Sequence, residues 1–438
     1  MSRRFGPGGP LRGSLVSPPD KSISHRAAIV AAMGEGETVV RGYLDSADTR
    51  STLGAVRALG AEVQGIDDGA VRVRGVGLRG ARPAAIDVGN AGTLMRILPG
   101  WLAGQPEGEW TLDGDESIRR RPVDRVVQPL TEMGADIGVR DGRVAPIQVR
   151  AAELQGIEYR LPVASAQVKS CLLLAGLLAD GETTVIESQP TRDHTERMLR
   201  AAGATVTAEP TGTSIAIRGE LPATRVRVSP AERLELGEIT IPGDFSSAAF
   251  FAVAASLVRG SEMRLEGVGV NPGRIGLLGI LTRMGAAIEV VETAPAGGEP
   301  VASLGVRSGP LQGTRVAGGE VPLAIDELPL VALLGCFAEG ETVVAGAEEL
   351  RHKESDRIDT VVDGLRGLGA EIEATADGFA VTGGGGLRGG TLDAAGDHRL
   401  AMLGAVAGLA SREGVEVQGF EAAQVSYPGF ADDLAGLL

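Results

Sequence analysis

The feature that most constrains this chain is a sequence unit that recurs six times. Each copy opens with a G-E-x-x-V-like stretch, continues through a polar segment and an amphipathic helix pattern, and ends on L-G-A before another apolar run; the sixth copy is truncated. The copies begin at Gly36, Gly108, Gly181, Gly260, Gly340 and Gly414. A spacing of about 75 residues is too long for a solenoid repeat, so each copy is expected to be a small unit of strands and helices.

The repeat predicts an α/β fold. A further apolar helix pattern precedes each G-E-x-x-V strand, and a second strand often follows L-G-A, so each copy is expected to form β-α-β-α-β-β. Because 438 residues exceed one comfortable core, we expect two similar domains, each of three repeats around a pseudo-threefold axis. The fourth repeat begins near Ile239, and residues 1–16 can supply the strand that the last repeat lacks. The expected first domain, residues 17–238, is therefore inserted into a second domain of residues 1–16 and 239–438.

Charge and hydropathy exclude several classes of protein. The chain has 42 Lys+Arg against 57 Asp+Glu, a net charge of −15, which disfavours a nucleic-acid or anionic-membrane partner. The longest apolar runs, 171–179 and 248–258, fall short of the about 20 residues that a membrane span needs. The basic N-terminal stretch lacks the apolar core of a secretory signal. We therefore expect a cytoplasmic enzyme without a membrane or nucleic-acid partner.

Two G-x-G-x-x-G matches, at Gly75 and Gly384, raise the question of a dinucleotide site. A dinucleotide fingerprint runs from a strand directly into a helix, whereas Gly75 is followed by ARPAAIDVGN, with Pro83 inside. Both matches also occupy the same place in the repeat. We interpret them as turn glycines of the scaffold.

Polar segments recur where the first helix of each repeat is expected to start. Helix N-termini expose N–H groups and the positive end of the helix dipole, so they favour anions. The segments are PDKSISHRA at Pro19, GNAGTLMR at Gly89, ASAQVKS at Ala164, PGDFSSAAF at Pro242, IDELPL at Ile325 and GDHRLAM at Gly396. Helix capping explains any one of them, but six at one topological place predict a cleft between the domains for a polyanionic substrate.

Cations gather near the same places. The chain has 39 arginines but only three lysines, Lys21, Lys169 and Lys353, and a compact titratable ammonium is not interchangeable with a guanidinium. Lys21 and Lys353 fall in helix-start segments, as do Arg121 and Arg192. Lys169 lies one helical turn beyond Ser165, where it either faces the cleft or supports it.

Carboxylates beside these cations are candidates for acid–base chemistry. Glu354 adjoins Lys353, with Arg357 one turn away, an arrangement that can shift pKa values. Asp326 and Glu327 interrupt an otherwise apolar segment, where a carboxylate needs a partner or a role. The metal motifs HExxH and paired CxxC, the P-loop and G-x-S-x-G are all missing from the sequence, so we expect no metal and no cofactor.

Taken together, these motifs resemble the 5-enolpyruvylshikimate-3-phosphate synthase family over essentially the full chain. PDKSISHR resembles the family's P-x-K-S-x-S-x-R, GNAGTLMR its G-N-(A/S)-G-T-x-x-R and RRRP its R-P segment; SAQVKS, RHKESDR and DHRLAM follow in the expected order. The resemblance implies transfer of the enolpyruvyl group from phosphoenolpyruvate to the 5-hydroxyl of shikimate 3-phosphate, with release of phosphate. It also implies two three-repeat domains that close on substrate.

The resemblance assigns roles to individual residues. It places Asp326, Glu354 and Lys21 in catalysis, with Asp326 as the base toward the hydroxyl. The residues implied for shikimate 3-phosphate are Lys21, Ser22, Arg26, Ser165, Ala166, Gln167, Arg192, Asp326 and Lys353. Those implied for phosphoenolpyruvate are Lys21, Gly92, Arg121, Gln167, Arg357 and Arg399.

Three positions bear on how far the resemblance extends. Ala166 stands where many relatives have a second serine, which leaves one fewer hydroxyl for the substrate phosphate. Val425 replaces a lysine found in some members. Gly92 lacks the methyl group of some herbicide-tolerant members, so we predict sensitivity to glyphosate.

Rival functions remain open at this stage. UDP-N-acetylglucosamine enolpyruvyl transferases share the scaffold and the donor, but that family normally uses a mobile-loop cysteine, whereas Cys171 and Cys336 lie in apolar runs typical of buried helices. An RNA 3′-phosphate cyclase-like ligase is disfavoured by the acidic charge, and a non-catalytic scaffold would not need the clustered cations. We expect a monomer that binds small molecules.

Overall fold

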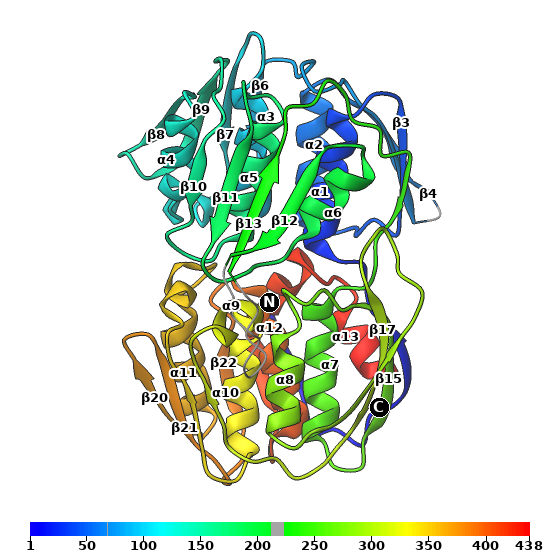
Figure 1. The fold of residues 1–438 in the computed structure, drawn as a ribbon. Coiled ribbons are helices and arrows are strands. Elements are labelled where there is room, and N and C mark those ends of the chain that lie inside the picture. The colour runs from blue at the N-terminus through cyan, green and yellow to red at the C-terminus, as the bar shows by residue number, and fades with distance from the viewer. Residues whose placement is uncertain (68, 212–222) are drawn as a thin grey trace. The chain divides into compact units, whose positions relative to one another are not determined.

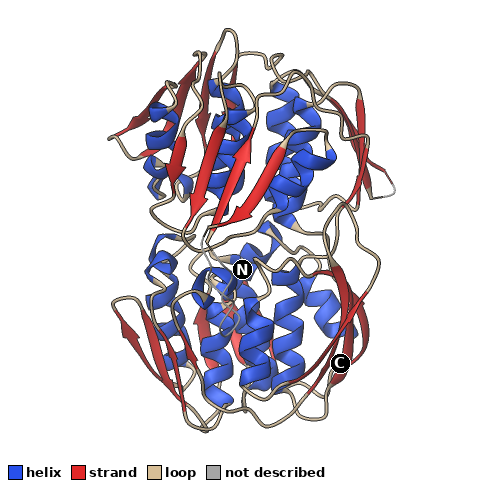
Figure 2. Cartoon of the chain, viewed as in Figure 1, coloured by secondary structure: helices blue, strands red, loops and turns tan. Residues whose placement is uncertain are grey.

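The structure is a computed structural model and describes residues 1–67, 69–211 and 223–438. The chain forms two compact units. The N-terminal unit comprises Pro19–Pro242 and Pro295–Glu299, and the C-terminal unit comprises Met1–Pro18, Gly243–Ala294 and Pro300–Leu438. The division expected at 16/17 and 238/239 stays a prediction. Within each unit the helices lie inside and the sheets form the outer layer (Figures 1 and 2).

The N-terminal unit contains three four-stranded sheets of one design, in which a parallel pair of strands is followed by two antiparallel strands. The first repeat consists of β14 (Glu238–Thr240), α1 (Lys21–Met33), β3 (Glu37–Arg41), α2 (Ala47–Ala58), β4 (Glu62–Asp67) and β5 (Ala70–Arg74). The second consists of β6 (Ala84–Asp87), α3 (Gly92–Ala103), β7 (Glu109–Asp113), η1 (Ile118–Arg120), α4 (Asp124–Glu132), β8 (Asp136–Arg140) and β9 (Val144–Arg150). The third consists of β10 (Glu158–Arg160), α5 (Ala166–Gly176), β11 (Thr183–Glu187), α6 (His194–Ala201), β12 (Val206–Pro210) and β13 (Thr224–Val228).

The C-terminal unit repeats this design with a shortened last sheet. The fourth repeat consists of β2 (Arg12–Val16), α7 (Phe245–Leu257), β15 (Glu262–Gly269), α8 (Gly276–Arg283), β16 (Ala287–Glu292) and β17 (Val301–Arg307). The fifth consists of β18 (Arg315–Val316), α9 (Glu320–Ala324), α10 (Leu328–Phe337), β19 (Glu341–Val344), η2 (Glu348–His352), α11 (Arg357–Gly367), β20 (Glu371–Thr375) and β21 (Gly378–Thr382). The sixth consists of β22 (Gly390–Asp393), α12 (His398–Ala410), β23 (Val415–Gln418), η3 (Phe420–Val425), α13 (Phe430–Gly436) and β1 (Ser2–Phe5).

The predicted α/β class and six-repeat organisation are confirmed, but three strands come from distant parts of the chain. β14, which the sequence pattern assigned to the start of the fourth repeat, pairs in parallel with β3 of the first, and β2 pairs in parallel with β15 of the fourth. β1 pairs with β23 and completes the truncated last repeat, as residues 1–16 were expected to do. Strand pairing between residues so far apart in the chain leaves no local pattern in the sequence from which it can be predicted.

Backbone conformation explains why glycine recurs at two positions of every full repeat. The glycine of all six G-E-x-x-V-like stretches has φ between 82° and 123°, and the glycine of all five L-G-A-like motifs, which read L-G-A, M-G-A or A-G-A, has φ between 89° and 104°. At L-G-A the next amide closes the helix by bonding back to its last turn, as in Ala61 N to Val56 O at 3.0 Å. Only glycine adopts this left-handed geometry without a steric cost.

Each unit has its own apolar core. The inner helices α1, α3 and α5, and likewise α7, α10 and α12, are buried on nearly all sides. Close helix packing needs small residues: a Cβ on Gly100 of α3 would lie 2.1 Å from the Cys171 carbonyl oxygen of α5. The starts of these inner helices are therefore held in place by their own packing.

The turn-glycine interpretation of the two G-x-G-x-x-G matches is confirmed. Gly75 follows β5 and Gly384 follows β21, and each segment leads to another strand rather than to a helix. Both predicted buried thiols are also confirmed, since Cys171 in α5 and Cys336 in α10 are 1% and 2% exposed. Among the residues described, no helix has both the length and the apolar character needed to cross a membrane.

Candidate active site

The start of α1 carries three of the predicted substrate residues. Asp20 caps the helix by accepting from the Ile23 amide at 2.8 Å. Lys21 Nζ lies 3.1 Å from Asp48 Oδ2, and the lysine side chain keeps 16% exposure. Arg26, one turn later, is buried and donates to Thr195 Oγ1 at 2.8 Å, to Ser170 Oγ at 2.9 Å and to the Ser22 carbonyl at 3.0 Å. Arg26 thus ties the starts of α1, α5 and α6 together.

At the start of α3, Gly92 leaves room for two guanidinium groups. A Cβ on Gly92 would lie 3.0 Å from Arg121 Nη1 and 3.1 Å from Arg96 Nη1. Arg121 is 6% exposed and donates to Asn90 Oδ1 at 2.7 Å and Ser117 Oγ at 2.8 Å. The structure therefore brings Gly92 and Arg121, two residues predicted for phosphoenolpyruvate, into contact.

At the start of α5, Ser165 caps the helix by accepting from the Val168 amide at 3.4 Å. Ala166 is the first helical residue. Gln167 donates to Thr93 Oγ1 at 3.1 Å and accepts from Arg96 Nη1 at 3.2 Å, which joins α5 to α3. Arg192 is half-buried and lies two residues before α6.

Lys169 does not line the site but supports the helices that form it. It is 1% exposed, and its ammonium lies 2.8 Å from Glu187 and 2.7 Å from Glu196, both equally buried. Burial alone favours the neutral amine, but the Glu196 and Glu187 charges outweigh it and raise the pKa of Lys169. The ion pairs connect α5, β11 and α6.

In the C-terminal unit, the Asp326 carboxylate lies among three cations. Oδ1 is 3.5 Å from Lys353 Nζ and 3.6 Å from Arg357 Nη1, and Oδ2 is 3.7 Å from Arg399 Nη2. Arg399 also donates to the Asp326 carbonyl at 3.1 Å. With 13% of its side chain exposed, Asp326 retains access to solvent.

Arg357 connects Glu354 to the start of α12. Its guanidinium is 1% exposed, 2.5 Å from Glu354 Oε2 and 2.7 Å from Asp397 Oδ2. Burial opposes the Asp397 charge, but Arg357 overrides it and holds the pKa of Asp397 below its usual range. Glu354 has 20% side-chain exposure and is therefore accessible to solvent.

The helix boundaries differ slightly from the sequence expectation. α10 begins at Leu328 with Glu327 as its N-cap, so Asp326 precedes the helix; Lys353 and Glu354 lie between η2 and α11. These residues belong to the turns that enter helices, where side chains depart from helical spacing. The predicted residues of this unit nevertheless come together.

Glu327 was singled out with Asp326 from the sequence, but the resemblance assigned it no role. It is 1% exposed, accepts a short hydrogen bond from the Ser246 hydroxyl, and lies 3.6 Å from Arg399 Nη1. Burial is the main cause that raises the pKa of Glu327, with Arg399 opposing and the Asp326 charge adding to it. The adjacent pair of carboxylates in an apolar segment was the available clue.

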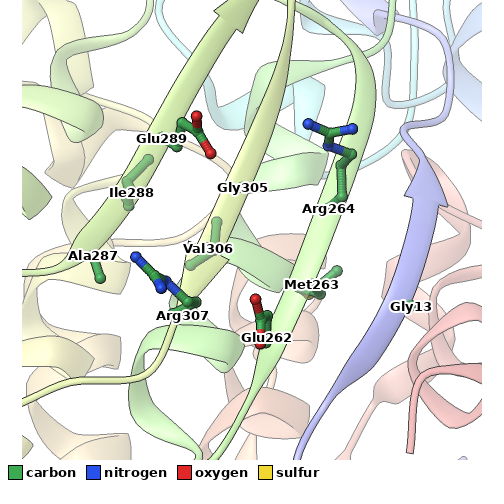
Figure 3. A pocket seen from close by; sticks show the side chains of 10 residues that line it. All are labelled: Gly13, Glu262, Met263, Arg264, Ala287, Ile288, Glu289, Gly305, Val306 and Arg307. Carbon is green, nitrogen blue, oxygen red and sulfur yellow. The ribbon is translucent and has the colours of Figure 1, made fainter.

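A separate hollow of about 690 Å³ lies on the outer face of the β16-β17-β15-β2 sheet (Figure 3). Arg264 and Arg307 line it together with Glu262 and Glu289, and Gly305 leaves its floor open. None of the predicted site residues lines this hollow. Among the described residues, no group of three or more His, Cys, Asp or Glu side chains could hold a metal ion.

The chain has the fold of the enolpyruvyl transferases. The crystal structure of the enolpyruvyl transferase NikO from Streptomyces tendae aligns over 99% of this chain and 96% of its own, with a TM-score of 0.76 at 18% identity. The structure of EPSP synthase from Acinetobacter baumannii aligns over 100% of this chain and 98% of its own, with a TM-score of 0.85 at 39% identity.

Sequence comparison gives the family within this class. Residues 6–434 match the profile of EPSP synthase (3-phosphoshikimate 1-carboxyvinyltransferase). The 3-phosphoshikimate 1-carboxyvinyltransferase of Alkalilimnicola ehrlichii is 49% identical over 98% of this chain and 94% of the relative, and that of Gloeobacter violaceus is 50% identical over 97% and 96%. The chain belongs to the EPSP synthase family, as the sequence motifs indicated.

Proposed function

We propose that this chain transfers the enolpyruvyl group of phosphoenolpyruvate to the 5-hydroxyl of shikimate 3-phosphate and releases phosphate, in the shikimate pathway to chorismate and the aromatic amino acids. The observation that carries the proposal is the Asp326 carboxylate among Lys353, Arg357 and Arg399. Such a group combines a base with cations suited to acidic, phosphorylated metabolites. Family membership supplies the substrates.

Both units contribute to the proposed binding. Shikimate 3-phosphate is assigned to Lys21, Ser22, Arg26, Ser165, Ala166, Gln167, Arg192, Asp326 and Lys353. Phosphoenolpyruvate is assigned to Lys21, Gly92, Arg121, Gln167, Arg357 and Arg399. The helix starts that carry these residues favour anions through their free N–H groups, and Ala166 contributes its backbone alone.

The proposed chemistry is addition followed by elimination. Asp326 takes the proton of the 5-hydroxyl while the hydroxyl oxygen forms a bond to the central carbon of phosphoenolpyruvate. Glu354 or Lys21 delivers a proton to the methylene carbon. In the second stage that carbon loses a proton, the double bond re-forms, and the bond to phosphate breaks. Lys21 would stabilise the leaving phosphate. Arg357 lies 2.5 Å from the Glu354 carboxylate and so fixes its position for this role.

The remaining expectations concern how the protein works in the cell. We propose that residues 17–238 act as one three-repeat domain and residues 1–16 with 239–438 as the other, and that both are needed for turnover. The enzyme is expected to act as a cytoplasmic monomer on small molecules alone, consistent with its net charge of −15. Glyphosate is expected to lower turnover when phosphoenolpyruvate is limiting; undiminished turnover at millimolar glyphosate would contradict this.

The choice of acceptor is the direct test. Phosphate release from phosphoenolpyruvate is measured with shikimate 3-phosphate or with UDP-N-acetylglucosamine. We expect release with the first and none with the second, and release with the sugar alone would overturn the proposal. The buried state of Cys171 and Cys336 argues against the sugar reaction, because burial raises both thiol pKa values, that of Cys336 to about 12.

A further inference from the structure

Glu327 is a buried carboxylate for which the proposed reaction has no step. It is the N-cap residue of α10, but its side chain makes no capping hydrogen bond to that helix. Instead Oε1 accepts from the Ser246 hydroxyl and lies 3.6 Å from Arg399 Nη1. The carboxylate is therefore directed toward α7 and α12.

The direction of the hydrogen bonds is fixed by Arg274. This buried arginine donates to Asp244 Oδ1 at 2.7 Å and to Ser246 Oγ at 3.0 Å. An arginine can only donate, so the Ser246 oxygen is the acceptor there and its hydroxyl proton is left for Glu327. Glu327 thus receives hydrogen bonding from a rigid, buried chain of partners.

The same carboxylate links the starts of all three inner helices of the C-terminal unit. Ser246 is the second residue of α7, Glu327 precedes α10, and Arg399 is the second residue of α12 (Figure 1). The Arg399 guanidinium also donates to the Asp326 carbonyl at 3.1 Å and lies 3.7 Å from Asp326 Oδ2. Arg399 is therefore held between Glu327 and the proposed base.

We propose that Glu327 is a positioning residue for the transfer reaction, whose carboxylate holds the Arg399 guanidinium in the orientation that receives phosphoenolpyruvate. Glu327 itself touches no substrate, and the proposal rests on the proposed function. Arg399 and Glu327 form a buried ion pair at 3.6 Å, and a charged partner attracts a guanidinium more strongly than a neutral one does. Loss of the charge should therefore loosen Arg399 and weaken the donor site while leaving the acceptor site intact.

Electrostatics separate this role from a structural one. The charges that face Glu327 are Arg399, Asp326 and Arg274, and burial together with Asp326 raises its pKa. A carboxyl with a raised folded-state pKa contributes its stability below the unfolded pKa and loses it as the pH rises through the folded value. At alkaline pH a neutral substitute should therefore keep or increase the melting temperature.

The test compares Glu327→Gln with Glu320→Gln, a control in α9 whose carboxylate pairs with Arg283 at 2.6 Å near the surface. For E327Q we expect the KM for phosphoenolpyruvate to rise at least ~10-fold, the KM for shikimate 3-phosphate to stay within ~2-fold, and the melting temperature at pH 8 not to fall. The E320Q variant should match the wild type in both KM values. Ser246→Ala, which removes the donor to Glu327, should raise the KM for phosphoenolpyruvate ~3-fold or more.

Two results would overturn the inference. One is a KM for phosphoenolpyruvate within ~2-fold of wild type in both E327Q and S246A. The other is a parallel rise of both KM values with a lower melting temperature, which indicates general loss of structure. Failure of the proposed function has a different signature, because wild type and E320Q would then both lack turnover with shikimate 3-phosphate.

Discussion

The two units use different chemistry at equivalent helix starts. In the N-terminal unit, α3 and α5 are joined by the neutral Gln167 amide, which bonds Thr93 and Arg96. In the C-terminal unit the corresponding places hold ionised groups, with Asp326 facing Arg357 and Arg399. One repeat design therefore supports an amide link between inner helices in one unit and ion pairs in the other.

The placement of buried charge follows the same division. In the N-terminal unit, the ion pairs of Lys169 with Glu187 and Glu196 are fully buried behind the helix starts and do not reach the surface. The C-terminal unit exposes part of its charge network through Asp326 and Glu354. Under the proposed function, the first unit contributes most of the residues that bind both substrates, and the second contributes the carboxylates Asp326 and Glu354 for proton transfer.

The largest effect on turnover is expected from the charge cluster of the C-terminal unit. Asp326→Asn keeps the shape of the side chain but removes the base, so kcat should fall by at least ~10²-fold. Steady-state phosphate release with saturating substrates measures it. Turnover near that of wild type would show that Asp326 is not the base, and the C-terminal unit would then have no special role in removing the hydroxyl proton.

Lys169→Met tests whether the inner charge cluster of the N-terminal unit is structural. It leaves Glu187 and Glu196 buried without a cation, which should lower the free energy of unfolding by about 3–5 kcal/mol at neutral pH. The deficit should shrink as the pH falls, because burial already raises the pKa of Glu196, the loss of the opposing Lys169 charge raises it further, and protonation removes the unpaired charge. Urea unfolding across pH measures this.

The matched control for K169M is Arg283→Met, which breaks an ion pair with Glu320 near the surface. That pair is partly exposed, and its loss should cost less than about 1 kcal/mol. A K169M deficit no larger than that of R283M would show that the buried cluster contributes little.

Gly92→Ala probes the close approach of Arg121 in the N-terminal unit. The added Cβ would lie 3.0 Å from Arg121 Nη1, so the guanidinium must shift and the KM for phosphoenolpyruvate should rise ~10-fold. Gly54→Ala in α2 is the control, because its Cβ meets nothing within 4 Å. It should leave the KM unchanged, and an equal rise in both variants would refute a specific role for Gly92.

The smallest effect is expected at the neutral link. Thr93→Val removes the hydroxyl that accepts from Gln167, and loss of one neutral hydrogen bond costs about 1 kcal/mol. The KM for shikimate 3-phosphate should therefore rise several-fold, while Thr131→Val on the exposed face of α4 changes nothing. If T93V raised the KM for shikimate 3-phosphate more than E327Q raised the KM for phosphoenolpyruvate, the neutral link would matter more than the charged one, contrary to the proposed difference between the units.

Much of this architecture follows from local sequence patterns. The two repeated glycines mark left-handed turns, and the polar segments mark the six inner helix starts, because both depend on chemistry within a few residues. The exchange of β2 and β14 between distant repeats depends on long-range pairing, and no local pattern carries it.

The limits at the site have a similar origin. Sequence reasoning singled out Asp326 and Glu327 together but could not separate their roles, because these depend on which side chain points toward Ser246 and which toward Lys353. It also left the position of Lys169 open, since the partners Glu187 and Glu196 lie on other elements. Burial and ion pairing decide these cases, and both are properties of the packed structure.

The most direct test of the account places both acceptors in one tube. Phosphorus NMR follows the enzyme with phosphoenolpyruvate, shikimate 3-phosphate and UDP-N-acetylglucosamine together. The account predicts that inorganic phosphate appears in step with a new resonance from modified shikimate 3-phosphate while the sugar stays unchanged. Consumption of phosphoenolpyruvate that tracks the sugar, or unaltered spectra after long incubation, would contradict it.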